Sequence, residues 1–239
     1  MATTADVPDA RVRPPGALRA LSPGRLEAFS DGVFAIAITL LVIELHPPSS
    51  GEPLVATLEH EWPRYLGYLV SFAFIGGVWM AHSNMTRFLR FVDVPLLRLN
   101  LLLLLFVSLL PFTTATVATH LFVSYLATGN DVSTSQGAER VAVVLFGADL
   151  TLAALMIFLL IRRASRVRSI AVDDQAEEEL KRFASDRRTA MLSQAGATVV
   201  GVFIPPLAVI FYLSVSVLFI ISPFTVSRLH ALRRRRPGT

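Results

Sequence analysis

Six runs of apolar residues alternate with polar segments along the chain. The first run, residues 29–45, contains 17 residues, and a helix of that length extends about 26 Å, close to the roughly 30 Å thickness of a bilayer core. The other five runs cover residues 65–80, 94–123, 138–161, 189–204 and 207–226. The pattern therefore predicts an all-α membrane protein with six transmembrane helices per chain.

Prolines mark two features of these spans. Pro111 lies inside the third span and predicts a kink there, because proline cannot donate the usual helical hydrogen bond. Pro205 and Pro206 separate the fifth span from the sixth, so a very short turn is expected between them.

Basic residues are distributed unevenly among the segments that join the spans. Of the 22 Lys and Arg residues, only Arg64 and Arg140 fall on one predicted side of the membrane. Cytoplasmic segments carry an excess of Lys and Arg, so both termini are expected to be cytoplasmic. The expected organisation is a cytoplasmic arm (1–24), a six-helix domain (25–230) with a cytoplasmic loop (162–188), and a basic tail (231–239).

Two of these charged segments invite a closer interpretation. The tail contains four consecutive arginines at 233–236, which we interpret as an anchor for anionic lipid headgroups, with a partner site or a sorting signal as the alternative. Residues 173–188 mix acidic and basic residues at helical spacing. This segment is expected to be a solvated helical extension of the fifth span.

Composition narrows the possible function classes. Hydrophobic residues make up 53% of the chain and charged residues only 17%, against roughly a quarter charged in ordinary globular proteins. The absence of cysteine excludes disulfides and thiolate chemistry. The five histidines lack zinc-site spacing, and no phosphate-binding loop or serine elbow is present. We therefore expect neither an enzyme, nor a cofactor, nor a resident metal, nor a nucleic-acid partner.

The first span carries the most informative pattern. Ile36, Leu40 and Ile43 recur at the spacing of one helix face, and Thr39 lies beside that face. An aliphatic face is ordinary in lipid, so packing or lipid contact is one interpretation. Arg25, Ser30 and Asp31 cluster at the predicted inner end, and ionisable groups at membrane depth usually have partners and a purpose.

The segment from Arg25 to Leu41 resembles the signature first helix of the transmembrane protein 175 family of potassium channels. The similar positions are Arg25, Phe29, Ser30, Asp31, Gly32, Val33, Phe34, Ala35, Ile36, Ile38, Thr39, Leu40 and Leu41, with His82, Asp93, Asn100, Pro111 and Phe112 further along. A single six-helix repeat is similar to the family's bacterial form. The resemblance implies a homotetramer in the bacterial plasma membrane that conducts monovalent cations and prefers K⁺.

In that family the first helices line the pore. Carried over by position, Ile36 would form the hydrophobic constriction, and Leu40 and Ile43 would form two further apolar rings. Thr39 would supply the hydroxyl linked to K⁺ preference, with K⁺ passing transiently beside it. The residue spacing leaves another role open for Thr39, a hydrogen bond to the carbonyl of Ala35.

The remaining polar residues are expected to hold this helix in place. Asp31 lies about 140° around an ideal helix from Ile36 and is expected to point into the bundle. His82 and Asn100 are its predicted partners at similar depth, and we hypothesise an Asp31–His82 hydrogen bond. A proton-coupled secondary transporter that uses Asp149 or Asp31 is the alternative function, and a structural membrane protein without transport is the third.

Overall fold

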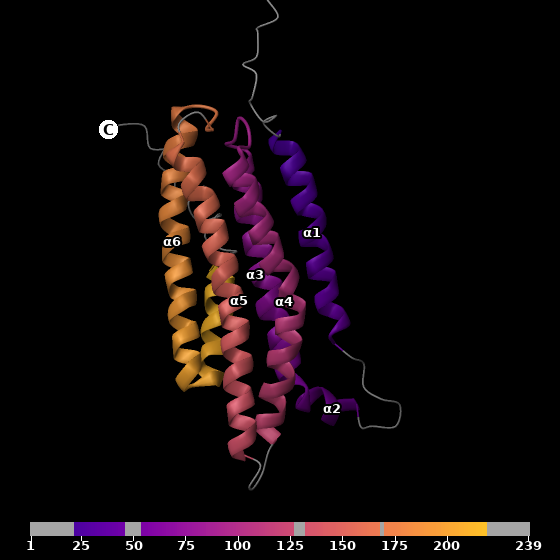
Figure 1. Ribbon diagram of the computed structural model, residues 1–239. Helices are drawn as coiled ribbons and strands as arrows, with labels where there is room; N and C mark the ends of the chain where they lie inside the picture. Colours follow the sequence, from indigo (N-terminus) through magenta and orange to yellow (C-terminus); the bar gives the residue numbers. More distant parts are fainter. Residues whose placement is uncertain (1–21, 46–53, 127–131, 168–169, 219–239) are drawn as a thin grey trace, which may run out of the picture.

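The computed structural model describes residues 22–45, 54–126, 132–167 and 170–218, and every described element longer than a turn is helical. Six helices are α1 (Pro23–Ile43), α2 (Leu54–His60), α3 (Trp62–Thr86), α4 (Val94–Leu126), α5 (Val132–Arg166) and α6 (Asp174–Phe203). A further helix covers Pro205–Leu218. The long helices run side by side as a bundle, whereas the short α2 lies across one end (Figure 1).

Four of the described helical segments are long and apolar enough to cross a membrane: Pro23–Ile43, Arg64–Thr86, Val94–His120 and Gly137–Arg166. They correspond to the first four predicted spans. The predicted fifth span is the apolar second half of α6, and only 207–218 of the predicted sixth span is described. The chain is thus a multi-pass helical membrane protein, and the count of six spans stays a prediction.

Local sequence explains where the helices begin and end. Pro23 opens α1 directly after the N-cap residue Ser22, because proline is well suited to the first turn of a helix. The helix α6 ends at Phe203, and Ile204 has φ −134° and ψ 80°, outside the helical region that a following proline disfavours. This confirms the predicted very short turn before the last helix.

The α4 helix continues through Pro111 without interruption. One turn further on, the hydroxyl of Thr114 donates to the carbonyl of Leu110 at 2.6 Å. This bond lies beside the site of the missing donor and does not replace it, since the carbonyl that Pro111 leaves without its backbone donor is that of Val107, four residues earlier.

The segment 162–188 is largely helical. The α5 helix extends to Arg166, and α6 begins at Asp174, where the Asp173 side chain accepts a hydrogen bond from the N–H of Ala176 at 2.7 Å. This confirms the predicted helical extension of the fifth span. Of the other predicted segments, residues 1–21 of the arm and the whole basic tail lie outside the described residues.

The core lies between α3, α4, α5, α6 and the last helix, and one side of α1 packs onto it. Phe146 of α5 meets Tyr212 edge to face with ring centroids 5.7 Å apart, and both side chains are fully buried. The neighbouring residue Gly147 makes this approach possible, since a Cβ there would lie 2.0 Å from the Tyr212 hydroxyl.

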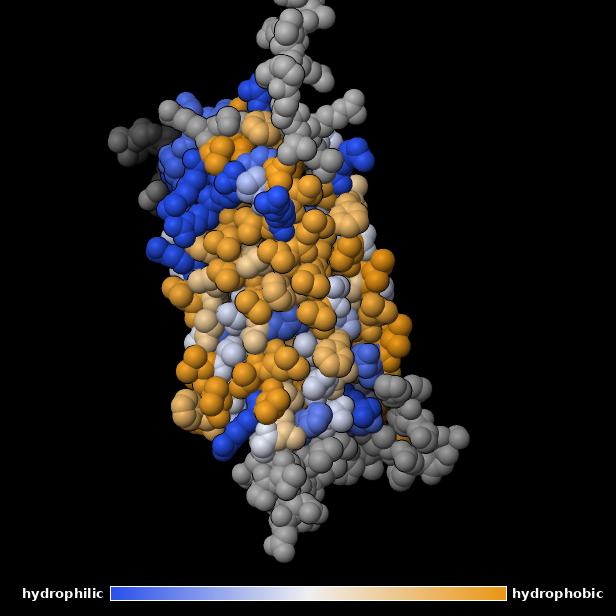
Figure 2. All heavy atoms as spheres, in the orientation of Figure 1, coloured by the Kyte–Doolittle hydropathy of each residue, from blue (hydrophilic) through white to orange (hydrophobic). Residues whose placement is uncertain are grey.

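Two turns meet at one end of the bundle. The N–H of Arg90 donates to the carbonyl of Ile170 at 2.7 Å, and the N–H of Val172 donates to the carbonyl of Phe88 at 3.1 Å. The α3–α4 and α5–α6 connections therefore lie on the same side, together with their arginines. Figure 2 shows hydrophilic residues at this end above an apolar band.

An ion pair reinforces the same end. Arg163 at the end of α5 donates from Nε and Nη2 to the carboxylate of Asp93, which precedes α4. Burial raises the pKa of Asp93, but the hydrogen bonds from Arg163 and from the N–H of Leu96 outweigh burial and hold this pKa below its usual range. The pair locks the start of α4 onto α5.

Candidate functional site

Helix α1 packs on the bundle through one narrow stripe. Its buried residues are Leu26, Ser30, Phe34, Ala37 and Leu41, at the spacing of a single helix face. They contact α3 and α4. In the apolar stretch of α1 only 28% of the residues are buried, against 50% in the spans of α3 and α4 and 61% in that of α5. Of the 21 residues of α1, 11 are exposed.

The candidate pore residues lie on this uncovered surface. Ile36 is 61% exposed, Leu40 is 42% exposed and Ile43 is 66% exposed. On an ideal helix their common direction is about 110° from the centre of the buried stripe. The structure therefore places the three predicted side chains together and leaves them accessible in the single chain.

Thr39 is exposed beside these residues. Its hydroxyl donates to the carbonyl of Ile36 at 2.9 Å, so the expected acceptor, the carbonyl of Ala35, is wrong. The bond uses the hydroxyl hydrogen and leaves the oxygen lone pairs for an acceptor role. A threonine held in this way presents partial negative charge on the side of α1 that carries Ile36.

A fully buried polar cluster fixes α1 from behind. Asn100 of α4 donates from Nδ2 to Ser30 Oγ at 3.0 Å, and Ser30 donates to the carbonyl of Leu26 at 2.8 Å. His82 of α3 lies 2.9 Å from Asn100 Oδ1 through Nε2, and this nitrogen must donate because a carbonyl oxygen only accepts. We call Ser30, His82 and Asn100 the anchor cluster, and it joins three helices at one depth.

Asp31 is not part of the anchor cluster, and the hypothesised Asp31–His82 hydrogen bond is wrong. The indole of Trp79 instead donates to Asp31 Oδ1 at 2.9 Å. Asp31 follows Ser30 and is turned about 100° around α1, so it reaches the flank of α3 that carries Trp79. Of the predicted polar residues, the structure thus joins Ser30, His82 and Asn100, pairs Asp31 elsewhere, and leaves Arg25 exposed at the helix start.

The sequence interpretation missed further ties between α1 and α3. Ser83 donates to Glu27 Oε1 at 3.1 Å, and the ring of Phe34 lies 5.7 Å from that of His82. Trp79 could have been found, since it lies three residues before His82 and so shares one side of α3. The Glu27 contact had no such signal, because both residues are ordinary on a polar helix end.

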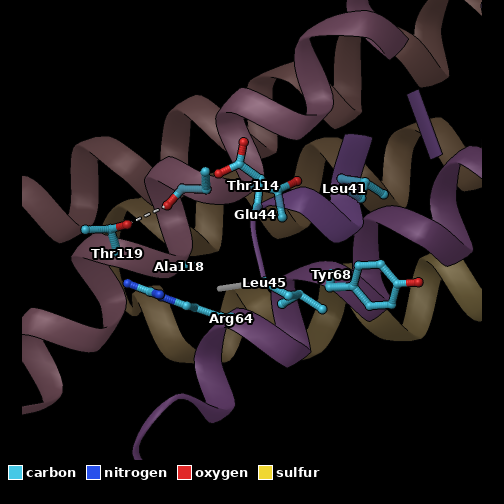
Figure 3. Close-up of a pocket in the computed structure, with 9 residues that line it drawn as sticks. Leu41, Glu44, Leu45, Arg64, Tyr68, Thr114, Ala118 and Thr119 are labelled. Carbon is cyan, nitrogen blue, oxygen red and sulfur yellow. Dashed lines mark hydrogen bonds between the residues drawn. The ribbon is translucent and has the colours of Figure 1, made fainter. Parts of the chain in front are cut away.

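A small cavity lies behind the other end of α1, near Leu41 of the buried stripe (Figure 3). Glu44, Arg64 and Tyr68 line it together with residues of α4, and Thr119 there donates to the carbonyl of Ala115 at 2.9 Å. Its volume is about 50 Å³, and Ile36, Leu40 and Ile43 do not line it.

Asp149 lies apart from α1, between α4 and α5. It is 5% exposed, and its Oδ2 accepts a hydrogen bond from Thr113 at 2.9 Å. Within the described residues, no group of three His, Asp or Glu side chains is placed to hold a metal ion. The candidate site thus consists of an exposed helix side and the polar contacts behind it.

The segment that contains this candidate site is similar to known channel proteins. Residues 25–111, which include the anchor cluster, Trp79 and all of α1 but its first two residues, match the family described as the endosomal/lysosomal potassium channel TMEM175. A potassium channel of Streptomyces collinus is 46% identical over 100 residues, which cover 41% of this chain and 48% of that protein. A potassium channel of Chamaesiphon minutus is 45% identical over 102 residues, 41% of this chain and 50% of that protein. These matches confirm the family resemblance.

Solved TMEM175 structures extend the similarity beyond the matched segment. A TMEM175 homologue from Chamaesiphon minutus, described as a lysosomal potassium-selective channel homologue, is 29% identical, covers 84% of this chain and 97% of that chain, and has a TM-score of 0.69. A variant of the potassium channel MtTMEM175 shares the fold, with 20% identity over 92% of this chain and 98% of that chain and a TM-score of 0.58.

The sequence matches cover a smaller part of the relatives than the structural matches do. The chain spans about half the length of the curated bacterial relatives it matches. The human relative, named an endosomal/lysosomal proton channel, is 40% identical over 101 residues, 38% of this chain and 20% of that protein. All of these TMEM175 relatives are named as channels, and none as an enzyme.

Proposed function

We propose that four copies of this chain form a potassium-preferring cation channel whose pore is lined by α1. The observation that carries the proposal is the exposure of Ile36, Leu40 and Ile43 on a TMEM175 signature helix whose other side is tied to the bundle. Four such apolar sides that meet on an axis would cover one another. The names of the bacterial relatives support K⁺ as the permeant ion.

Ile36 forms the constriction in this proposal. A ring of four isoleucines narrows a pore until water leaves it, and an ion then meets a dehydration barrier that a small widening removes. Leu40 and Ile43 extend the apolar section toward the other end. Conduction is passive, because nothing in such a ring couples one ion to another.

Preference for K⁺ needs a further contribution, since apolar side chains cannot replace a hydration shell. The larger K⁺ ion loses its water more readily than Na⁺. The oxygen of Thr39, whose hydrogen is directed to Ile36, would face the passing ion and offer it lone pairs. A transient K⁺ contact at Thr39 is therefore part of the proposal.

The anchor cluster has a positioning role. Its three buried side chains fix the rotation of α1 about its own axis, and the Trp79–Asp31 bond fixes the flank. A rotation of α1 by one residue, about 100°, would turn Ile36 away from the axis. The cluster thus keeps the constriction aligned in each subunit.

The basic end of the bundle is assigned to the cytoplasm. Arginines of the α3–α4 and α5–α6 connections gather there, which matches the excess of basic residues on cytoplasmic segments. The proposed location is the bacterial plasma membrane, with lipid and identical subunits as partners. A proton-coupled transporter is less well supported, because Asp149 is enclosed beside Thr113 and Asp31 is bonded to Trp79.

Potassium flux into liposomes tests the proposal. Ile36→Ala should raise passive K⁺ flux by about tenfold or more, which corresponds to a barrier lower by about 1.4 kcal/mol. Val42→Ala is the matched control, since Val42 is 53% exposed on the same helix and about 120° from Ile36. Proton-dependent, saturable uptake that Ile36→Ala leaves unchanged would instead indicate a transporter.

A further inference from the structure

A polar groove lies between α5 and α6 at the basic end of the bundle, far from α1. Its volume is about 390 Å³, within the roughly 300–1,000 Å³ range of ligand pockets. Four cationic side chains line it: Arg162 and Arg166 from α5, and Lys181 and Arg188 from α6. Among the residues that the structure describes, the lining includes no carboxylate.

The positions of these cations follow from helix geometry. Arg162 and Arg166 are four residues apart and so share one side of α5. Lys181 and Arg188 are seven residues apart, two turns along one side of α6. Because α5 and α6 pack against each other, the two pairs face a common space. Like charges gathered in this way repel one another, and a bound anion would relieve that repulsion.

The cations differ in what already contacts them. Lys181 is shared with Glu177 and Glu178, at 2.7 and 3.0 Å. The guanidinium of Arg162 lies over the Phe158 ring, 5.8 Å from its centre, and an aromatic face does not use up the N–H donors of an arginine as a carboxylate does. Arg163, the neighbour of Arg162, is occupied by Asp93 and does not line the groove.

The groove is amphipathic along its length. Arg166 ends the apolar span of α5, whereas Phe158 lies eight residues deeper, about 12 Å along the helix. Ala184 adds a second apolar wall from α6. In Figure 2 the hydrophilic end over α5 and α6 stands directly above the apolar band. A cationic rim above an apolar floor at the membrane boundary suits a headgroup with its acyl chains attached.

We propose that this groove binds the phosphate headgroup of an anionic glycerophospholipid from the inner leaflet. Arg162, Arg166 and Arg188 donate to the phosphate oxygens, and the first carbons of the acyl chains lie along Phe158. Basic pockets between transmembrane helices on the cytoplasmic side are a known setting for such headgroups. The lipid would clamp α5 to α6 through charge, in addition to their apolar contact.

Native mass spectrometry of the purified full-length protein tests this site. Phosphatidylglycerol, phosphatidylcholine and inorganic phosphate are each added to the detergent-solubilised protein. We expect phosphatidylglycerol to bind, phosphatidylcholine to bind at least about tenfold more weakly, and inorganic phosphate not to displace the lipid. Arg162→Gln with Arg166→Gln should weaken phosphatidylglycerol binding by about tenfold or more.

Arg87→Gln with Arg90→Gln is the matched control, because it removes the same charge from exposed positions at the same end. It should retain the binding of the unmodified chain. Arg188→Gln alone probes the α6 wall should the α5 pair disturb folding, and it should weaken binding several-fold. Equal losses in the groove and control variants would overturn the proposal. Displacement of the lipid by inorganic phosphate would also overturn it, since the site would then bind a water-soluble anion.

Discussion

Helices α1 and α5 are both apolar enough to cross a membrane, yet the chain uses them differently. In the span of α5, 61% of the residues are buried, whereas only 28% are buried in the apolar stretch of α1. The apolar residues of α5, such as Phe146, form the core. In α1, apolar residues outside the buried stripe, such as Ile36, are left exposed. Two helices of similar hydrophobicity can therefore have different roles. The share of buried residues distinguishes a helix that forms the core of the bundle from one that leaves a side exposed.

The first prediction concerns packing, where the difference should be largest. Phe146→Ala removes a ring that is fully buried against Tyr212. It should lower the free energy of unfolding by about 3 kcal/mol, the lower end of the range for a buried Phe→Ala change. The lower end is expected because lipid is as apolar as the core, so that the change removes mainly packing contacts. Ile36→Ala should change it by less than about 0.5 kcal/mol. Denaturant titration in detergent, followed by circular dichroism, measures both values, and equal values would remove the distinction between the two helices.

The second prediction concerns the hydrogen bonds that join α1 to α3 and α4. Asn100→Ala removes the hydrogen bonds to Ser30 and His82. It should cost about 1–3 kcal/mol, since each interhelical hydrogen bond in a membrane contributes roughly 0.6–1.7 kcal/mol. Ser108→Ala on the same helix is the control, because Ser108 is exposed and bonded to its own helix. The same unfolding assay compares them, and a loss no greater in Asn100→Ala would contradict the role of the anchor cluster.

The third prediction concerns the ion pair between Asp93 and Arg163. Asp93→Asn should cost about 1–2 kcal/mol at pH 7, because a charge-assisted hydrogen-bonded pair at a partly exposed position is lost. The pKa of Asp93 is lowered in the folded chain, so this stability is fully present above the unfolded value of about 3.9. It should disappear as the pH falls through the folded pKa.

Unfolding of both chains over a series of pH values provides the measurement. The gap between the unmodified chain and Asp93→Asn should be constant from pH 7 to about pH 5 and should close at lower pH. A gap that widens on acidification would show that the carboxylate is not stabilised by Arg163.

The smallest structural effect is expected at Thr39. Thr39→Val should change the free energy of unfolding by less than about 0.5 kcal/mol, because the residue is exposed and its bond is local. The ratio of K⁺ to Na⁺ flux should nevertheless fall, by less than about tenfold, and Thr39→Ser should preserve it. An unchanged ratio in Thr39→Val would leave the hydroxyl with a purely local role.

The first four spans and their order could be predicted because hydrophobic runs act locally in sequence. The turn at Pro205 is an example, since proline restricts the backbone of Ile204 whatever surrounds it. The helical extension before residue 189 was predictable for the same reason, from acids and bases at helical spacing.

Pairings between helices could not be predicted to the same degree. His82 and Asp31 were expected to bond because they lie at one depth, but helix rotation gives His82 to Asn100 and Asp31 to Trp79. Rotation is set by the packing of Phe34 and Leu41 into the bundle, and no spacing along one helix reports it. The Arg163–Asp93 pair was missed because its members are 70 residues apart.

The central claim, that the Ile36 side of α1 lines the ion path, is most directly tested by cysteine accessibility. The chain has no cysteine, so Ile36→Cys and Val42→Cys each carry a single thiol. Silver ions, which bind thiolates and pass where small cations pass, should block K⁺ flux through reconstituted Ile36→Cys by more than about tenfold and leave Val42→Cys unaffected. Block of Val42→Cys with Ile36→Cys unaffected would contradict the account, because it would turn the opposite side of α1 toward the ion.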